Sequence, residues 1–199
     1  MSDINPNKTT IFTTPIWGYD FVSHSDFKAD FIETIDSYAD MNSIVNNELS
    51  SLSIQTVSNL HQNPIFRPLV DRILQICSDL KTEFHLEDSV GLGLRSMFAT
   101  KTQPKGFQTV TKFNNALLQG FYFIETPKNS GILNIYNPCP EPSYFLFGVT
   151  NNSTFNQEKY RSLMPEGAII LLPSHLNVDI TLNESDAART IIHFCICTV

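Results

Sequence analysis

The second half of the chain is a succession of short apolar or alternating runs, and this pattern limits the possible folds more than any other feature. From Ser89 onward, clusters of Gly, Pro and Asn separate one run from the next, as turn residues do. Many short strands divided by turns are typical of an antiparallel sandwich or barrel. The predicted strands are residues 90–98, 117–124, 132–136, 144–149, 168–172, 179–182 and 190–199.

Two helical patterns precede these strands. In residues 26–38 apolar side chains recur at helical spacing, and Ser25 or Asp26 can cap the start of the helix. In residues 66–80 apolar side chains form one stripe, which predicts a helix that covers one face of a sheet; the stripe consists of Phe66, Leu69, Val70, Ile73, Leu74, Cys77 and Leu80. Residues 11–21 read as an extended segment that Pro15 places at an edge or a bend, whereas residues 42–59 predict no regular element. The order of elements predicts an α+β fold, an antiparallel sandwich backed by N-terminal helices.

Length and composition predict one domain and argue against several kinds of partner. A chain of 199 residues buries about 70% of its unfolded surface, so we expect a single domain over 1–199, with a helical cover over about 24–86 and a β core over about 89–199. The net charge is -7 and the Lys and Arg residues are scattered, which predicts no nucleic-acid partner. No apolar run approaches the roughly 20 residues that span a bilayer, and the N-terminal sequence lacks the apolar core of a signal peptide. We therefore expect no membrane partner and no secretion through a signal peptide.

The cysteines do not predict a disulfide framework, because four in a chain of this length are too few. Cys195 and Cys197 share one face of a predicted strand with His193, which raises the possibility of a metal cluster. Alternate residues on a strand lie about 6.6 Å apart, farther than the ligands of one ion usually sit. We therefore interpret these cysteines as reduced, buried core residues.

Three blocks carry a resemblance to a known family. They are residues 11–17 (IFTTPIW), residues 115–138 with GFYF and NSGILNIYNP, and residues 164–194 with MPEG, LPS and RTIIHF. In this order they resemble the Fe(II)/2-oxoglutarate-dependent oxygenases found in cyanobacteria and their tailed phages. The resemblance covers most of the chain and implies a double-stranded β-helix, a jelly-roll-like pair of sheets around a pocket. It also implies Fe(II), held by two histidines and one carboxylate, and the cosubstrate 2-oxoglutarate.

The positions that this resemblance assigns to the iron ligands hold other residues. The first ligand pair falls on Thr111 and Phe113, and the second histidine falls on Val178. A threonine hydroxyl is a poor ligand for Fe(II), and the other two side chains have no lone pair, so we expect no metal and no cofactor here. The resemblance further implies that Arg189 and Tyr122 belong to a vestigial 2-oxoglutarate pocket. In the family a small hydroxyl residue often follows the arginine by two positions, where this chain has an isoleucine.

Plainer interpretations stand beside these assignments. His193 on a core strand is predicted to be a hydrogen-bonded core histidine, and Arg189 can equally be paired with a nearby Asp or Glu. An unorthodox Fe(II) site is the alternative, with His175, Asp179 and His193 as its ligands. That arrangement requires a one-residue slip of a strand, which the neighbouring apolar pattern opposes.

We therefore predict a non-catalytic, oxygenase-like domain that has been reused as a structural or binding protein. The family's frequency in tailed phages suggests a component of the virion, with protein partners or self-assembly and a cytoplasmic or virion location. The alternative is an Fe(II)/2-oxoglutarate dioxygenase with non-standard ligands. A third hypothesis is a sugar- or small-anion-binding module that uses the emptied pocket beside Arg189.

Overall fold

The computed structural model describes residues 14–42, 53–109, 113, 115–138 and 157–199. Its N-terminal part is mostly helical, and local sequence explains where two of the elements start. The Asn63 side chain accepts the Ile65 N–H at 3.0 Å, and Pro68 occupies the first turn of the following helix, where a missing N–H costs nothing. The elements are β1 (Trp17–Asp20), α1 (His24–Asn42), β2 (Ser53–Gln55), η2 (Leu60–Gln62), η3 (Pro64–Phe66) and α2 (Arg67–Glu83).

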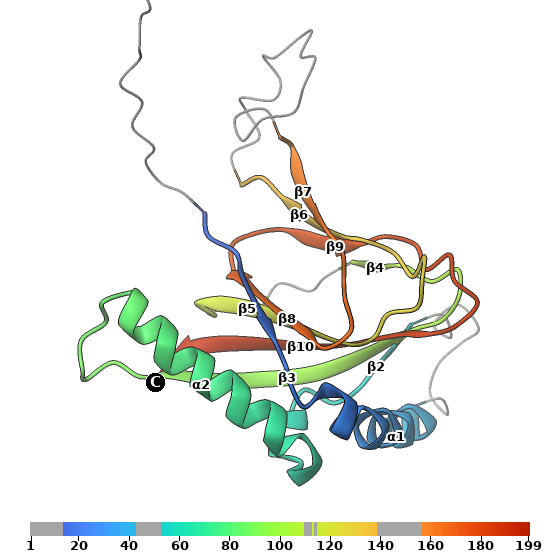
Figure 1. The fold of residues 1–199 in the computed structure, drawn as a ribbon, viewed down its shortest axis with the longest axis horizontal. Helices are drawn as coiled ribbons and strands as arrows, with labels where there is room; N and C mark the ends of the chain where they lie inside the picture. The colour runs from blue at the N-terminus through green and yellow to red at the C-terminus, as the bar shows by residue number, and fades with distance from the viewer. Residues whose placement is uncertain (1–13, 43–52, 110–112, 114, 139–156) are drawn as a thin grey trace, which may run out of the picture.

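The remaining strands, with β1 and β2, form two antiparallel sheets that face each other. The larger sheet has the order β1-β8-β5-β10-β3-β2, and the smaller has the order β4-β9-β6-β7. Figure 1 shows the helices on one face of the larger sheet and the smaller sheet on its other face. The strands are β3 (Leu92–Thr102), β4 (Gln108–Thr109), β5 (Leu118–Glu125), β6 (Leu133–Tyr136), β7 (Lys159–Ser162), β8 (Ala168–Pro173), β9 (Val178–Ile180) and β10 (Arg189–Thr198).

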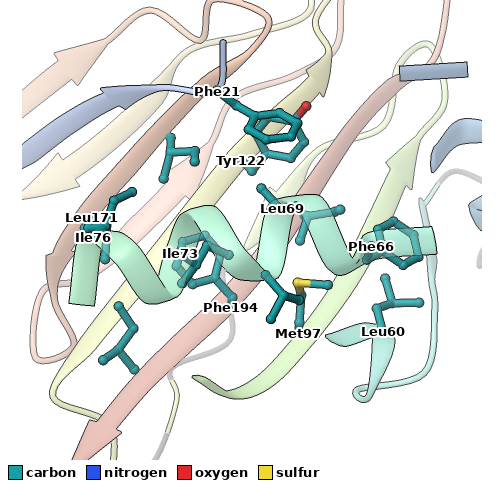
Figure 2. Close-up of a cluster of buried hydrophobic side chains, with 14 of the residues drawn as sticks. Phe21, Leu60, Phe66, Leu69, Ile73, Ile76, Met97, Tyr122, Leu171 and Phe194 are labelled. Atoms are coloured by element: carbon teal, nitrogen blue, oxygen red, sulfur yellow. The ribbon is translucent and has the colours of Figure 1, made fainter. Parts of the chain in front are cut away.

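The first core lies between the helices and the larger sheet. Leu69, Ile73 and Ile76 of α2 are fully buried against this sheet, where they meet side chains such as Met97 and Phe194 (Figure 2). The predicted apolar stripe of α2 is confirmed, with one difference. The stripe includes Leu74, which is 39% exposed, and it omits Ile76, which is fully buried.

The second core lies between the two sheets. Successive strand residues point to opposite faces, so each central strand contributes to both cores. On β5, for example, Phe121 and Phe123 point toward the smaller sheet, whereas Tyr122 and Ile124 point toward the helices. The smaller sheet closes this core with Leu133, Ile135, Val178 and Ile180.

At Gly120 a side chain of the first core packs directly against the backbone of the larger sheet. Gly120 on β5 lies directly opposite Phe194 on β10, and the Phe194 ring is fully buried. A Cβ at Gly120 would overlap this ring, because even the longest of its three nearest approaches, to Cε1, would be 2.8 Å. The ring therefore fills the space that a side chain at Gly120 would need.

The structure confirms both predicted helices and six of the predicted strands, and the extended segment after Pro15 forms the edge strand β1. The predicted strand over 144–149 lies outside the described residues. Residues 42–59 were expected to form no regular element. This expectation is wrong for residues 53–55, which form β2 by pairing with β3. The short strands β4 and β7 were not predicted either. None of the helices in the described part of the chain is long and apolar enough to cross a bilayer.

Candidate functional site

Arg189 is the only charged side chain among the described residues that is fully buried, and it lies between the two sheets at the start of β10. Its Nη1 donates to the carbonyl oxygens of Ser130 and Thr181, the latter at 3.1 Å. Its Nε and Nη2 have no partner within the described residues, and no Asp or Glu of that part of the chain forms an ion pair with it. The predicted acidic partner is therefore not found there. Burial lowers the pKa of Arg189 to about 10, so the guanidinium stays charged at neutral pH.

Two residues that the sequence did not single out shape the surroundings of this guanidinium. Gly131 adopts a φ of 112°, and a Cβ there would lie 2.5 Å from Arg189 Nη1 and 2.7 Å from the Thr181 carbonyl oxygen. Only glycine leaves room for the arginine at this point. Thr102 pairs with Arg189 across β3 and β10, and its buried hydroxyl oxygen has no partner among the residues described. Residues directly opposite each other on antiparallel strands point to the same face, so Thr102 and Arg189 share the face between the sheets.

His193 faces the same interior, four residues farther along β10, and is 1% exposed. Its Nε2 lies 2.9 Å from Thr100 Oγ1 and 3.1 Å from Gln108 Nε2. Its ring stacks on Phe98 with centroids 4.9 Å apart and meets the Phe121 ring edge to face at 5.2 Å. Burial, and secondarily the charge of Arg189, lower the pKa of His193 to about 3. The prediction of a hydrogen-bonded core histidine is confirmed.

The positions implied for the iron ligands lie in apolar surroundings. Phe113 is half-buried, and its ring centroid lies 5.8 Å from that of Phe98. Val178 is buried in the core between the sheets. Thr111 lies outside the described residues. Two of the three positions are therefore part of the hydrophobic packing.

The alternative ligand set is not brought together. His175 is exposed beyond the end of β8, whereas His193 is enclosed between the sheets. Asp179 accepts hydrogen bonds from Asn134 Nδ2 at 2.6 Å and Tyr136 Oη at 2.5 Å, and it points away from the interior because its neighbours on β9 point inward. β9 therefore does not show the one-residue slip that the alternative metal site requires. Within the described part of the chain, no group of three His, Cys, Asp or Glu side chains is placed to hold a metal ion.

The expectation that Tyr122 lines the pocket beside Arg189 is wrong. Tyr122 points to the helix face of the larger sheet, and its hydroxyl lies 2.7 Å from His24 Nδ1 on α1. Burial raises the pKa of Tyr122, and this hydroxyl therefore remains protonated. The one-residue alternation along β5 puts Phe121 and Phe123 into the interior instead.

The cysteines agree with the interpretation from sequence. Cys77, Cys195 and Cys197 are buried and free, and Cys139 lies outside the described residues. Burial raises the pKa of the Cys77 and Cys195 thiols to about 11, which disfavours the thiolate that a metal requires.

Solved structures establish the class of fold. The chain has the double-stranded β-helix of the 2-oxoglutarate oxygenases. A prolyl-4-hydroxylase from Pseudomonas putida matches with a TM-score of 0.59 and 10% identity, over 92% of this chain and 93% of that one. HygX from Streptomyces hygroscopicus, with nickel, 2-oxoglutarate and hygromycin B bound, matches with a TM-score of 0.59 and 10% identity, over 93% and 83%. The carbocyclase SnoK of nogalamycin biosynthesis matches with a TM-score of 0.64 and 12% identity, over 92% and 79%.

At these identities the similarity is one of fold. No protein-family model and no curated protein sequence matches the chain. Because the HygX structure has nickel and 2-oxoglutarate bound, the residues of this chain can be compared with the requirements of both groups. The described donor set does not fit Fe(II), because Phe113 and Val178 offer no lone pair and no two further His, Cys, Asp or Glu side chains of the described residues join His193 to form a ligand set. Arg189 does fit a carboxylate, since Nε and Nη2 are the pair of donors that a guanidinium offers side by side.

Proposed function

We propose that this chain is a non-catalytic protein of the 2-oxoglutarate oxygenase fold that binds a small carboxylate anion without a metal. The observation that carries this proposal is the buried guanidinium of Arg189, whose Nε and Nη2 have no partner among the described residues and whose strand neighbour Thr102 has a buried hydroxyl that is likewise unpartnered there. The expected reuse as a virion component stays a prediction.

The physical basis is the energetics of a buried charge. A guanidinium removed from water loses several kcal/mol of solvation unless a partner compensates for it. Two backbone carbonyls, of Ser130 and Thr181, accept from Nη1 but bring no negative charge. An anion that accepts from Nε and Nη2 would supply both the missing hydrogen bonds and the missing charge.

The apolar lining argues for binding rather than oxygen chemistry. Phe113, Val178 and the stacked pair Phe98 and His193 occupy the interior where the resemblance implies metal ligands. Their apolar surfaces are of the kind that contacts the carbon skeleton of a short organic acid. Phe98, Phe113 and Val178 offer no nitrogen or oxygen donor, and a single histidine does not make up the ligand set on which the family's oxygen activation depends.

The test is calorimetric titration of the EDTA-treated protein with 2-oxoglutarate and with succinate. We expect at least one of the two anions to bind without metal, and we expect binding to be lost in Arg189→Met. Arg95→Met is the matched control, since it removes the same charge from an exposed position on β3. Failure of both anions to bind, or equal binding by Arg189→Met, overturns the anion site.

A second measurement tests the absence of catalysis. The protein is loaded with Fe(II) under anaerobic conditions, desalted and analysed for iron, and then supplied with oxygen and 2-oxoglutarate. We expect iron far below one per chain and no succinate above the level of a protein-free control. One iron per chain together with succinate formation that Arg189→Met abolishes would establish the rival dioxygenase function.

A further inference from the structure

A groove that Arg189 does not line runs between the edges of the two sheets. It consists of two adjoining hollows of about 510 and 400 Å³, which share Gly18, Tyr160, Ser162 and Ile170. Thr14 and Ile16 line the groove where the chain enters β1, and Leu163 and Pro165 line it after β7. The groove therefore lies between β1 and β7.

Both strands that border the groove are edge strands. β1 pairs only with β8, and β7 pairs only with β6, among the residues that the structure describes. Each strand thus leaves one row of backbone N–H and C=O groups available, which is the arrangement that an added strand can complete.

The side chains of the groove continue the core between the sheets. Gly18 lies opposite Ile170, and Tyr160 lies opposite Ile135, and both isoleucines belong to that core. Partners directly opposite each other on antiparallel strands point to the same face. Gly18 and Tyr160 therefore face the interior, and the groove is the place where the interior opens to the surface.

The groove is apolar and has room at its floor. Ile16, Tyr160 and Leu163 are 39%, 51% and 76% exposed, which is unusual for large apolar side chains gathered in one place. A Cβ built on Gly18 would meet no atom within 4 Å. A side chain from another segment can therefore lie above Gly18 without displacing anything.

The chain itself contains a suitable occupant. Residues 1–13 precede Thr14 directly at the groove and include the adjacent apolar residues Ile11 and Phe12, within a β-branched stretch of high strand propensity. Thirteen residues can span up to about 43 Å in extended form, which exceeds the length of the groove strands several-fold. Pro15 fixes its own φ and restricts Thr14 to extended conformations, so a reversal of the chain at this point is disfavoured. Docking in the groove of another molecule does not require such a reversal.

We propose that residues 1–13 of one molecule occupy the β1–β7 groove of a second copy, with Ile11 or Phe12 above Gly18. The exchange is reciprocal, so it closes as a two-fold dimer in which each copy covers the other's open side. This inference does not depend on the anion site at Arg189.

Disulfide trapping between two differently tagged proteins tests the exchange. Both carry Cys139→Ser, and the other three native cysteines are buried. One carries Ile11→Cys and the other Ser162→Cys; after mixing and mild oxidation, we expect a cross-linked heterodimer. Ser78→Cys, at an exposed position on α2, replaces Ser162→Cys as the matched control and should give no more than background cross-linking.

Three further outcomes decide the proposal. Adding Gly18→Leu to the Ser162→Cys protein fills the groove and should abolish the cross-link, whereas Gly18→Ala should leave it intact. Circular dichroism establishes that each variant is folded. A single chain that carries both Ile11→Cys and Ser162→Cys and cross-links only to itself would overturn exchange between copies. So would a wild-type protein that light scattering shows to be monomeric at every concentration.

Discussion

Gly120→Ala is the substitution for which the structure gives the clearest expectation. The methyl group would enter the space of the Phe194 ring, with all three nearest ring carbons within 2.8 Å. Neither partner can yield easily, since Gly120 lies on a central strand and the ring is fully buried under α2. Overpacking of a tightly filled core costs about 1–3 kcal/mol.

Gly18→Ala is the matched control, because it makes the same chemical change on a strand of the same sheet. A Cβ at Gly18 meets no atom within 4 Å, so only the backbone entropy of the unfolded chain changes. Replacing a strand glycine with alanine then gains about 0.5–1 kcal/mol. Gly120→Ala has the same entropy term, so the two variants should differ by the overpacking cost, about 1–3 kcal/mol in their free energies of unfolding.

Urea unfolding followed by circular dichroism measures both values. In the double variant Gly120→Ala/Phe194→Leu, the ring atoms that the methyl group would overlap are gone. We expect this variant to recover about 1–2 kcal/mol relative to the sum of the two single changes. Equal stability of Gly120→Ala and Gly18→Ala, or additivity in the double variant, would refute the steric argument.

Three more expectations concern titration and packing. The folded pKa of His193, about 3, lies below its ordinary value of 6.5, so its contribution to stability is full above pH 6.5 and falls as the pH decreases. Urea unfolding at pH 7 and at pH 5 should therefore show a loss of about 2 kcal/mol in the free energy of unfolding. This loss should be much smaller in His193→Gln. Gly131→Ala places a Cβ at positive φ against Arg189, and we expect about 1–3 kcal/mol of destabilisation and, in the calorimetric titration, weaker anion binding. Tyr122→Phe removes the hydrogen bond to His24 and should cost about 1 kcal/mol in urea unfolding, with anion binding unchanged because Tyr122 lies on the other face of the sheet.

The helices and the main strands could be predicted because their signals are local. The stripe of α2 and the apolar runs of the central strands follow from spacing alone. The short strands could not be predicted in this way. β2, β4 and β7 have two to four residues and form because a neighbouring strand offers its edge.

The error over Tyr122 has a specific cause. Every residue of β5 from Leu118 to Ile124 is buried, because one face packs on helices and the other on the smaller sheet. A strand that is buried on both faces has no alternation of apolar and polar residues, so its sequence does not reveal which side chains point inward. Only the pairing with β10 and the packing of α1 and α2 determine the orientation.

The sequence by itself determined the order of helices and strands, the absence of metal-binding side chains at Phe113 and Val178, and the presence of an arginine on the last strand. The tertiary structure alone decided that Arg189 is buried without an acidic partner among the described residues, that Gly131 and Thr102 surround it, and that β1 and β7 leave a groove open. The physical reason is that spacing along a chain fixes local geometry, whereas burial, pairing and cavities depend on segments that are distant in sequence and meet only when the sheets assemble.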